Sequence, residues 1–181
     1  MKDALFFIAI VPDAQIQQEV TEFKQYLAEH FGASHALKSP PHITLFPPFK
    51  WPQDRVEALL AMLRDFAAPE ARFEIMLKNF NAFAPSVIYV DVMPNELLQN
   101  FQQRLENQLE KEFDLKNDRG HHGFNPHMTI AHKDLKHGLF AEAWQYFSLQ
   151  HYARTFEVEN IALLQHNGRR WDIYKQFSLG F

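Results

Sequence analysis

A four-residue motif that occurs twice constrains this chain more than any other feature of its sequence. Residues 41–44 are Pro-His-Ile-Thr, and residues 126–129 are Pro-His-Met-Thr. The chain contains only four threonines, and two of them stand two places after a histidine. Because alternate residues of a strand point to the same face, each histidine shares a face with its threonine, and aliphatic residues occupy the other face. The motif therefore predicts two matched strands, each with a polar face toward a cavity and an apolar face toward the core.

Apolar spacing and turn residues predict the other elements of the chain. The predicted helices cover 13–30, ended by Gly32, then 53–67, 94–113 and 139–147. The predicted strands cover 4–11, 42–46, which Pro47 and Pro48 end, 72–80, 86–92, 127–132, 155–164 and 171–177, with a polar loop over 116–124. The inward face of the 94–113 helix is predicted to carry Leu97, Leu98, Phe101, Leu105 and Leu109.

The order of these elements predicts the fold class. Helices and strands do not alternate strictly, which favours an α+β fold with mainly antiparallel pairing. The two motifs lie 85 residues apart in a chain of 181, and each follows a long amphipathic helix and a polar loop. We expect a single domain over 1–181 that is bilobal, with two interleaved, pseudo-symmetric lobes and one motif in each. Antiparallel sheets would line a central cleft, and helices would pack outside.

Composition limits the possible partners. The absence of cysteine excludes disulfides, thiolate metal sites and a cysteine nucleophile. A net charge of −4 gives no overall positive field for long duplex nucleic acid, so a nucleic-acid ligand would be an RNA end or a nucleotide-sized piece. Pro12 and Asp13 follow the apolar run over 4–11 directly, which favours a buried strand over a signal peptide. We expect a cytoplasmic monomer without membrane contact.

The motif residues suit acid/base chemistry at phosphorus. Histidine titrates near neutrality, so one imidazole can accept a proton while the other donates one. A threonine hydroxyl beside each imidazole can donate to a phosphoryl oxygen. No metal is required by this scheme. A histidine-rich stretch suggests a metal site as an alternative, but its spacing is not that of a metal motif, and strand alternation puts His127 and His132 on opposite faces. The stretch contains His121, His122, His127, His132 and His137.

Both motif segments carry a resemblance to a known family. The segments PPHITLFPPF, from Pro40, and FNPHMTIAHKDL, from Phe124, resemble the two signatures of the 2H phosphoesterase superfamily, and more narrowly its bacterial 2′-5′ RNA ligase-like branch. The resemblance implies a bilobal α+β fold with a cleft between two antiparallel sheets. It also implies hydrolysis of 2′,3′-cyclic phosphates to 2′-phosphates without a cofactor. By position, the catalytic residues would be His42, Thr44, His127 and Thr129.

The resemblance also suggests roles for these residues. In the better understood members, the residue matching His127 activates water and the residue matching His42 protonates the departing 3′ oxygen; in the ligating direction the roles exchange. Many relatives have an arginine shortly after the second motif, where this chain has His132 and Lys133. Strand alternation puts Lys133 on the cavity face, where it would attract phosphate as a point charge without the bidentate contact of arginine.

Other residues offer weaker hypotheses for ligand binding. Core packing is the default interpretation of each aromatic side chain, but four of them are candidates to stack on a base: Phe46, Phe83, Tyr89 and Trp171. Arg169 and Arg170 stand in a predicted hairpin turn and are candidates for RNA contact. Three functions fit the sequence: a 2′,3′-cyclic phosphodiesterase, a 2′-5′ RNA ligase using the same site, or a non-catalytic module that binds an RNA end or nucleotide.

Overall fold

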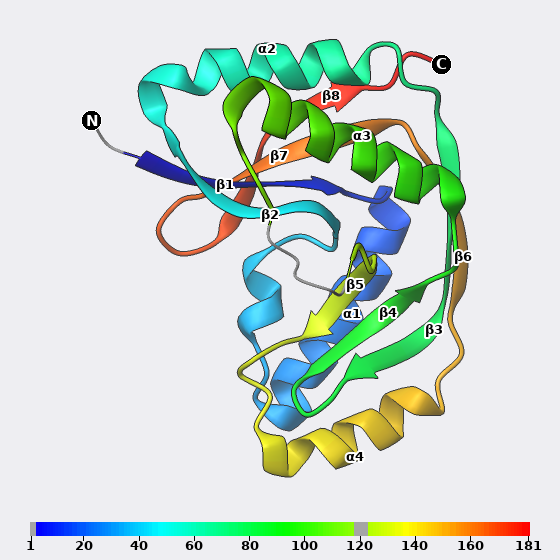
Figure 1. Ribbon diagram of the computed structural model, residues 1–181. Coiled ribbons are helices and arrows are strands. Elements are labelled where there is room, and N and C mark those ends of the chain that lie inside the picture. The colour runs from blue at the N-terminus through cyan, green and yellow to red at the C-terminus, as the bar shows by residue number, and fades with distance from the viewer. Residues whose placement is uncertain (1–2, 118–122) are drawn as a thin grey trace.

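The computed structural model describes residues 3–117 and 123–181 as two four-stranded antiparallel sheets with helices outside them (Figure 1). The strands are β1 (Asp3–Ile10), β2 (Ile43–Pro52), β3 (Phe73–Phe83), β4 (Val87–Val92), β5 (His127–Ala131), β6 (Ala153–Val158), β7 (Asn160–His166) and β8 (Trp171–Ser178). The helices are α1 (Ala14–Phe31), α2 (Val56–Ala67), α3 (Glu96–Phe113) and α4 (His137–Ser148), with short 3₁₀ turns η1 (His35–Lys38) and η2 (Gln53–Arg55). This arrangement confirms the α+β class and the two antiparallel sheets.

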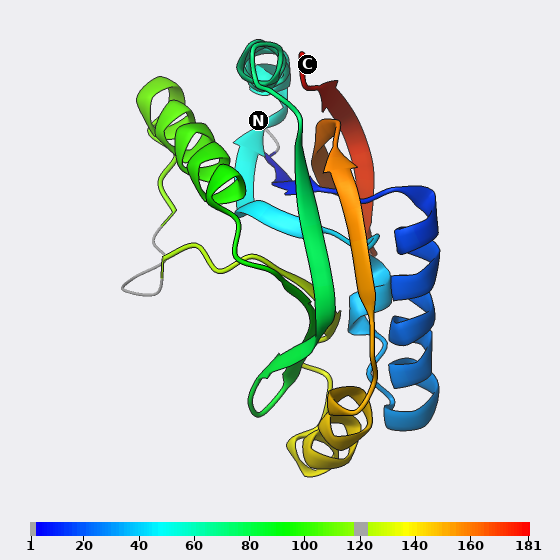
Figure 2. The ribbon, with the colours of Figure 1, turned by 90° about the vertical axis from the view of Figure 1, so that its right-hand side faces the viewer.

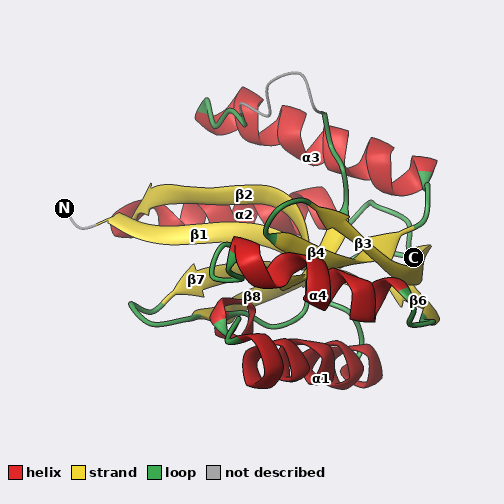
Figure 3. Ribbon diagram, turned by 90° about the horizontal axis from the view of Figure 1, so that it is seen from below, coloured by secondary structure: helices red, strands yellow, loops and turns green. Residues whose placement is uncertain are grey.

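Each motif strand is the edge strand of its own sheet. One sheet has the order β2-β1-β7-β8, and the other has the order β5-β4-β3-β6. The edge strands β2 and β5 lie side by side. Helices α1 and α3 cover opposite sides of the sheets, α1 packing against β5 and α3 against β2 and β3 (Figures 2 and 3). The two motifs therefore meet where the edges of the sheets meet.

The chain passes directly from one sheet to the other near its C-terminal end. The sequence predicts a single strand over 155–164, and this prediction is wrong: β6 ends at Val158 in the second sheet, and β7 begins at Asn160 in the first. Only Glu159 separates the two strands. Both strands have alternating and apolar character, so their local pattern does not reveal the change of sheet.

Strand β2 continues past the two prolines that were predicted to end it. Its pairing with β1 shifts register between Phe46 and Phe49, which places Pro47 and Pro48 at a bulge. Proline lacks a backbone donor, but an edge strand needs donors on one side only, so the prolines are tolerated there. A second register shift lies between Thr44 and Phe46. It breaks the alternation of the strand, so Phe46 is buried in the core instead of sharing the face of His42 and Thr44.

Helix ends follow the predicted capping residues. Asp13 caps α1 by accepting a hydrogen bond from the Ile16 amide at 3.0 Å, and Gly32 ends the helix in the left-handed conformation at φ 69°. In α3 the predicted inward residues are buried except Leu97, which is 63% exposed because it lies just off the apolar stripe. No helix in the described ranges is long and apolar enough to cross a membrane.

Candidate active site

The two motifs line one cavity of about 230 Å³. His42 directly precedes β2 and Thr44 lies on it, while His127 and Thr129 lie on β5. All four side chains are half-buried. The aliphatic residues between and beyond them are completely buried, as the alternation predicts: Ile43, Leu45, Met128 and Ile130. The remaining lining residues are His35, Ala36, Lys38, Ser39, His132 and Trp171.

Each motif imidazole is held by a backbone carbonyl two residues earlier. The Nδ1 of His42 lies 2.7 Å from the Pro40 oxygen, and the Nδ1 of His127 lies 2.8 Å from the Asn125 oxygen. A carbonyl oxygen only accepts, so Nδ1 carries the proton and Nε2 is left as the basic nitrogen. In both motifs a proline stands between the carbonyl and the histidine and fixes φ there. The Pro-His pair therefore sets the tautomer as well as the ring position.

Burial keeps both imidazoles neutral in the free protein. The pKa of His42 is lowered to about 4, chiefly by burial; the hydrogen bond to Pro40 opposes this shift, and the charges of Lys24 and His127 contribute to it. Burial also lowers the pKa of His127, against the hydrogen bond to Asn125 and the charge of Asp91. Both Nε2 atoms are therefore ready to accept a proton at neutral pH.

Aromatic rings pack against both histidines. The ring centroids of His42 and Phe7 lie 4.8 Å apart, and Phe7 in turn contacts Trp171. The ring centroid of His127 lies 5.2 Å from that of Phe83 and 5.2 Å from that of Tyr89. Of the four aromatic candidates for base stacking, Phe83 and Tyr89 thus contact a motif histidine directly. Trp171 contacts Phe7, which in turn packs against His42.

A second cavity, of about 490 Å³, adjoins the first and shares Thr44 and His127 with it. Three apolar residues contribute to its wall: Pro47, Phe83 and Phe124. Asn117, Gly123 and Asn125 complete the lining. An aromatic wall directly beside a motif histidine is suited to stacking with a flat ring of a ligand.

Two further histidines enter the cavity that sequence reasoning did not place there. His35 and His132 stack with their ring centroids 5.8 Å apart and their planes at 24°. Asp134 holds them together, because its Oδ2 accepts hydrogen bonds from the backbone amides of Ser34, at 2.9 Å, and His35, at 2.7 Å. These contacts join residues about 100 positions apart in the sequence, so no local sequence pattern predicts them.

The alternation of the second motif strand does not extend to His132 and Lys133. β5 ends at Ala131, so the predicted positions of His132, on the face opposite His127, and of Lys133, on the cavity face, are both wrong. His132 lines the cavity, whereas Lys133 is exposed and is not among the lining residues. Lys133 still lies close enough for its charge to lower the pKa of His132.

The structure also describes the candidate turn arginines and part of the histidine-rich stretch. Arg169 and Arg170 form the turn between β7 and β8, as predicted, and Arg170 pairs with Asp172 at 2.8 Å. His121 and His122 lie outside the described residues. Within the described residues, no three histidine, aspartate or glutamate side chains are grouped so that they could hold a metal ion.

The fold and the site together define a 2H phosphoesterase: two antiparallel sheets, each contributing one histidine–threonine pair to a shared cavity. The sequence model of the 2′-5′ RNA ligase superfamily matches residues 12–170, and the chain belongs to this family.

Full-length relatives and solved structures agree with this assignment. A Geobacillus sp. (strain WCH70) protein named "putative phosphoesterase" is 27% identical over 177 residues, 96% of this chain and 95% of that protein. A protein of Oceanobacillus iheyensis with the same description is 29% identical over 180 residues, 96% of each chain. The crystal structure of TT0787 of Thermus thermophilus has a TM-score of 0.69 at 18% identity, covering 97% of this chain and 98% of that one. E. coli LigT complexed with 3′-AMP has a TM-score of 0.67 at 17% identity, covering 99% and 100%.

Proposed function

We propose that this protein hydrolyses 2′,3′-cyclic phosphates, at RNA ends or on nucleotides, to 2′-phosphates by a metal-independent, two-histidine mechanism. The observation that carries the proposal is the matched pair of imidazoles in one cavity, each with Nδ1 bound to a backbone carbonyl and each beside a threonine hydroxyl. This is the arrangement that in-line displacement at phosphorus needs, with a proton acceptor on one side and a proton donor on the other.

The proposed reaction balances within the motif residues. One Nε2 takes a proton from water as the water oxygen bonds to phosphorus. The bond from phosphorus to the 3′ oxygen breaks, and the other imidazole, protonated before the step, donates its proton to that oxygen. Thr44 and Thr129 donate hydrogen bonds to the non-bridging phosphoryl oxygens. The product carries a 2′-phosphate and a 3′-hydroxyl, and a proton exchange between the histidines and solvent restores the site.

The two roles are distinguished by electrostatics and not by ring geometry, because both imidazoles are held in the same way. By resemblance, His127 would activate water and His42 would protonate the leaving oxygen. The lower pKa of His42 favours the exchanged roles, with His127 carrying the proton. An aryl phosphodiester tests this directly, because its phenolate leaves without a proton: only the variant that lacks the general acid retains activity on it.

A nucleoside is the group that suits the second cavity. Phe83 and Phe124 contribute to its wall beside His127, so a base attached to the reacting ribose could stack there. A protein of the same fold, E. coli LigT, has been crystallised with 3′-AMP, which supports a nucleotide-sized ligand. We expect Lys133 to contribute only long-range attraction for phosphate.

Turnover on 2′,3′-cyclic nucleotides in the presence of EDTA tests the proposal. We expect wild type to be active, and His42→Ala or His127→Ala to lose activity by about 100-fold or more, because each removes a proton-transfer group. His151→Ala changes an exposed histidine outside the cavity; it is the matched control and should keep full activity.

Full activity in either motif variant contradicts the mechanism, and loss of activity on chelation contradicts metal independence. Nucleotide binding without turnover by wild type would identify a binding module instead. If wild type also joins an RNA end that carries a 2′,3′-cyclic phosphate to one that carries a 5′-hydroxyl, the protein has 2′-5′ RNA ligase activity as well.

A further inference from the structure

A lysine is buried in helix α1 next to the active site, and the reaction described above does not use it. Lys24 is 1% exposed, and it is the only buried lysine among the described residues. Burial lowers its pKa to about 7, so a large part of its charge is retained at neutral pH in a place that disfavours charge. Burying a cation is costly unless its donors are satisfied, so the contacts of this side chain show what it does.

The Lys24 ammonium holds the segment that precedes the first motif. Its Nζ donates hydrogen bonds to the Ala36 and Ser39 carbonyls, both at 3.0 Å. Ala36 and Ser39 are themselves lining residues of the catalytic cavity. The residue after Ser39 is Pro40, whose carbonyl accepts the hydrogen bond from the Nδ1 of His42. A chain of contacts therefore runs from the helix, through the two consecutive peptide units that contain the Ser39 and Pro40 carbonyls, to the ring of His42.

The segment before the second histidine has a different support. The exposed Gln99 side chain donates a hydrogen bond to the Phe124 carbonyl at 3.3 Å, and Asn125 follows Phe124 as Pro40 follows Ser39. This contact carries no charge, and no other lysine within the described ranges is buried. The two motifs match in sequence and in the hydrogen bond that each ring makes. They differ in the side chain that supports the segment before each histidine. Lys24 thus makes the two imidazoles unequal in a way that the motif does not show.

We propose that Lys24 is a positioning residue for His42: its ammonium fixes the 36–40 segment, and thereby the ring, and its charge makes the environment of His42 different from that of His127. The role in turnover rests on the proposed function. Lys24 is 1% exposed and is not among the residues that line the cavity of the motif histidines, so the proposal gives it no contact with substrate.

Electrostatics gives the sign of the expected effect. The charge of Lys24 lowers the pKa of His42. At the pH where His42 titrates, about 4, Lys24 is protonated because its own pKa is about 7. Removing the charge should therefore raise the pKa of His42. The other titratable groups that face His42 are His127, His35, His132 and Lys38, and they are the same in every variant.

Two variants of Lys24 and two controls test the proposal. Lys24→Met removes donors and charge at similar volume, and Lys24→Arg keeps both. Val20→Ala is the control for general destabilisation, because Val20 is completely buried one turn earlier on α1. Lys111→Met is the control for loss of a lysine, since Lys111 is exposed on α3.

In turnover assays we expect Lys24→Met to lower kcat by about 10-fold or more with little change in KM, since a misplaced group costs rate and not binding. The limb of the pH profile that belongs to His42 should move to higher pH, and Lys24→Arg should restore most of kcat. Val20→Ala and Lys111→Met should keep the wild-type kcat and limb. Wild-type kcat and profile in Lys24→Met, or an equal loss of kcat in Val20→Ala, would overturn the proposal.

A spectroscopic measurement separates this inference from the proposed function. The ¹⁵N shifts of the His42 ring report its tautomer and pKa without any turnover. We expect wild type to show the Nδ1–H form, and Lys24→Met to show a mixture of forms and a raised pKa, even if no cyclic phosphate proves to be a substrate. An unchanged tautomer and pKa in Lys24→Met would reject the positioning role by itself, whatever the activity of wild type.

Discussion

At the scale of single residues, the position of each imidazole depends on three consecutive residues. The carbonyl of Pro40 or Asn125, the fixed φ of the proline and the histidine ring form the same short arrangement in both motifs. This explains why proline precedes the histidine in each copy. The arrangement sets the tautomer locally, but the pKa of each ring depends on what buries it.

The pKa directions predict where the pH optimum lies. In the free protein, kcat/KM should rise as the proton acceptor loses its proton and fall as the proton donor loses its own. With the pKa of His42 lowered to about 4 and that of His127 lowered below 6.5, we expect a bell-shaped profile with both limbs on the acid side of the ordinary imidazole range. Measuring kcat/KM on a 2′,3′-cyclic nucleotide from about pH 3 to 9 checks this. A cyclic phosphodiester itself does not titrate near neutrality, so a flat rate or an alkaline maximum would contradict the prediction.

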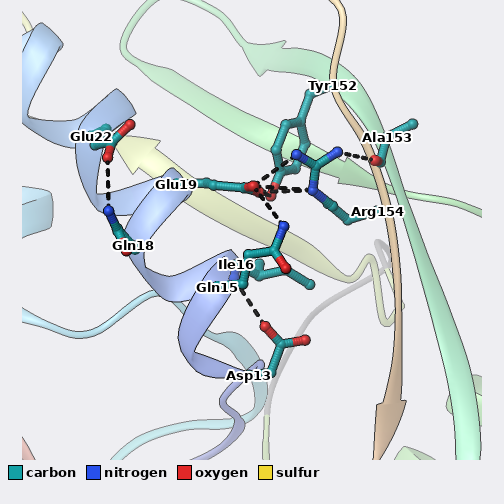
Figure 4. A network of polar contacts seen from close by, with 9 residues as sticks. All are labelled: Asp13, Gln15, Ile16, Gln18, Glu19, Glu22, Tyr152, Ala153 and Arg154. Carbon is teal, nitrogen blue, oxygen red and sulfur yellow. Dashed lines mark hydrogen bonds and ion pairs between the residues drawn. The ribbon is translucent and has the colours of Figure 1, made fainter.

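At the scale of elements, helix α1 connects the two sheets. Lys24 on this helix holds the segment before β2, and Glu19 holds the start of β6 in the other sheet. Figure 4 shows the second connection, in which Glu19 accepts hydrogen bonds from the Tyr152 hydroxyl, at 2.8 Å, and from Arg154, at 2.7 Å. The hydrogen bond to Arg154 is the main cause that lowers the pKa of Glu19. One helix thus contacts the segment before the edge strand of one sheet and a strand of the other sheet.

Removing the Tyr152 hydroxyl should weaken this connection. The ring of Tyr152 is buried, so we expect Tyr152→Phe to lower the free energy of unfolding by about 1.5 kcal/mol, the usual contribution of a hydrogen bond to a charged group. Because the pKa of Glu19 is lowered in the folded state, its contribution is present above its ordinary value of 4.5 and is lost as the pH falls through the folded value. The difference between wild type and variant should therefore narrow in acid. Urea unfolding at several pH values measures it, with the exposed Tyr174→Phe as the matched control. An equal loss in both variants would contradict the role of this contact.

At the scale of the whole molecule, the site exists because two sheet edges meet. The cavity of the motif histidines lies between the edge strands β2 and β5, and the second cavity extends from it beside Phe83 and Phe124. Neither cavity belongs to one sheet alone. Under the proposed function, the phosphate would lie between the histidines and an attached nucleoside would have an apolar wall.

Phe124 provides a test of this arrangement. We expect Phe124→Ala to raise KM for 2′,3′-cyclic AMP by about 5-fold or more, because stacking of a base on an aromatic ring contributes about 1–3 kcal/mol. KM for ribose 2′,3′-cyclic phosphate, which has no base, should not change. Steady-state kinetics with both substrates measures this, and Phe181→Ala, whose side chain is 80% exposed, is the control. Equal effects on the two substrates would show that the second cavity does not hold the base.

Much of the fold and the centre of the site could be predicted from local sequence patterns. The caps Asp13 and Gly32 set the ends of α1, and the alternation around His42 and His127 placed the motif histidines and threonines on polar faces above buried aliphatic residues. These features depend on neighbours within a few residues, which a sequence displays directly. The predictions fail where alternation ends, at the register shifts around Phe46 and beyond Ala131, and where the chain changes sheet at Glu159.

The sequence by itself determined which side chains could do the chemistry and which backbone held them, because strand parity and the Pro-His pair act over a few residues. Only the tertiary structure decided which other groups join them. His35 reaches His132 through Asp134, about 100 residues away, and Lys24 is buried because α1 packs against the segment before β2. Such contacts form when distant segments close on one another, and a side chain exposed in an isolated helix looks the same in sequence as one buried in a fold. The environment that sets the pKa of His42 is therefore a property of the folded molecule.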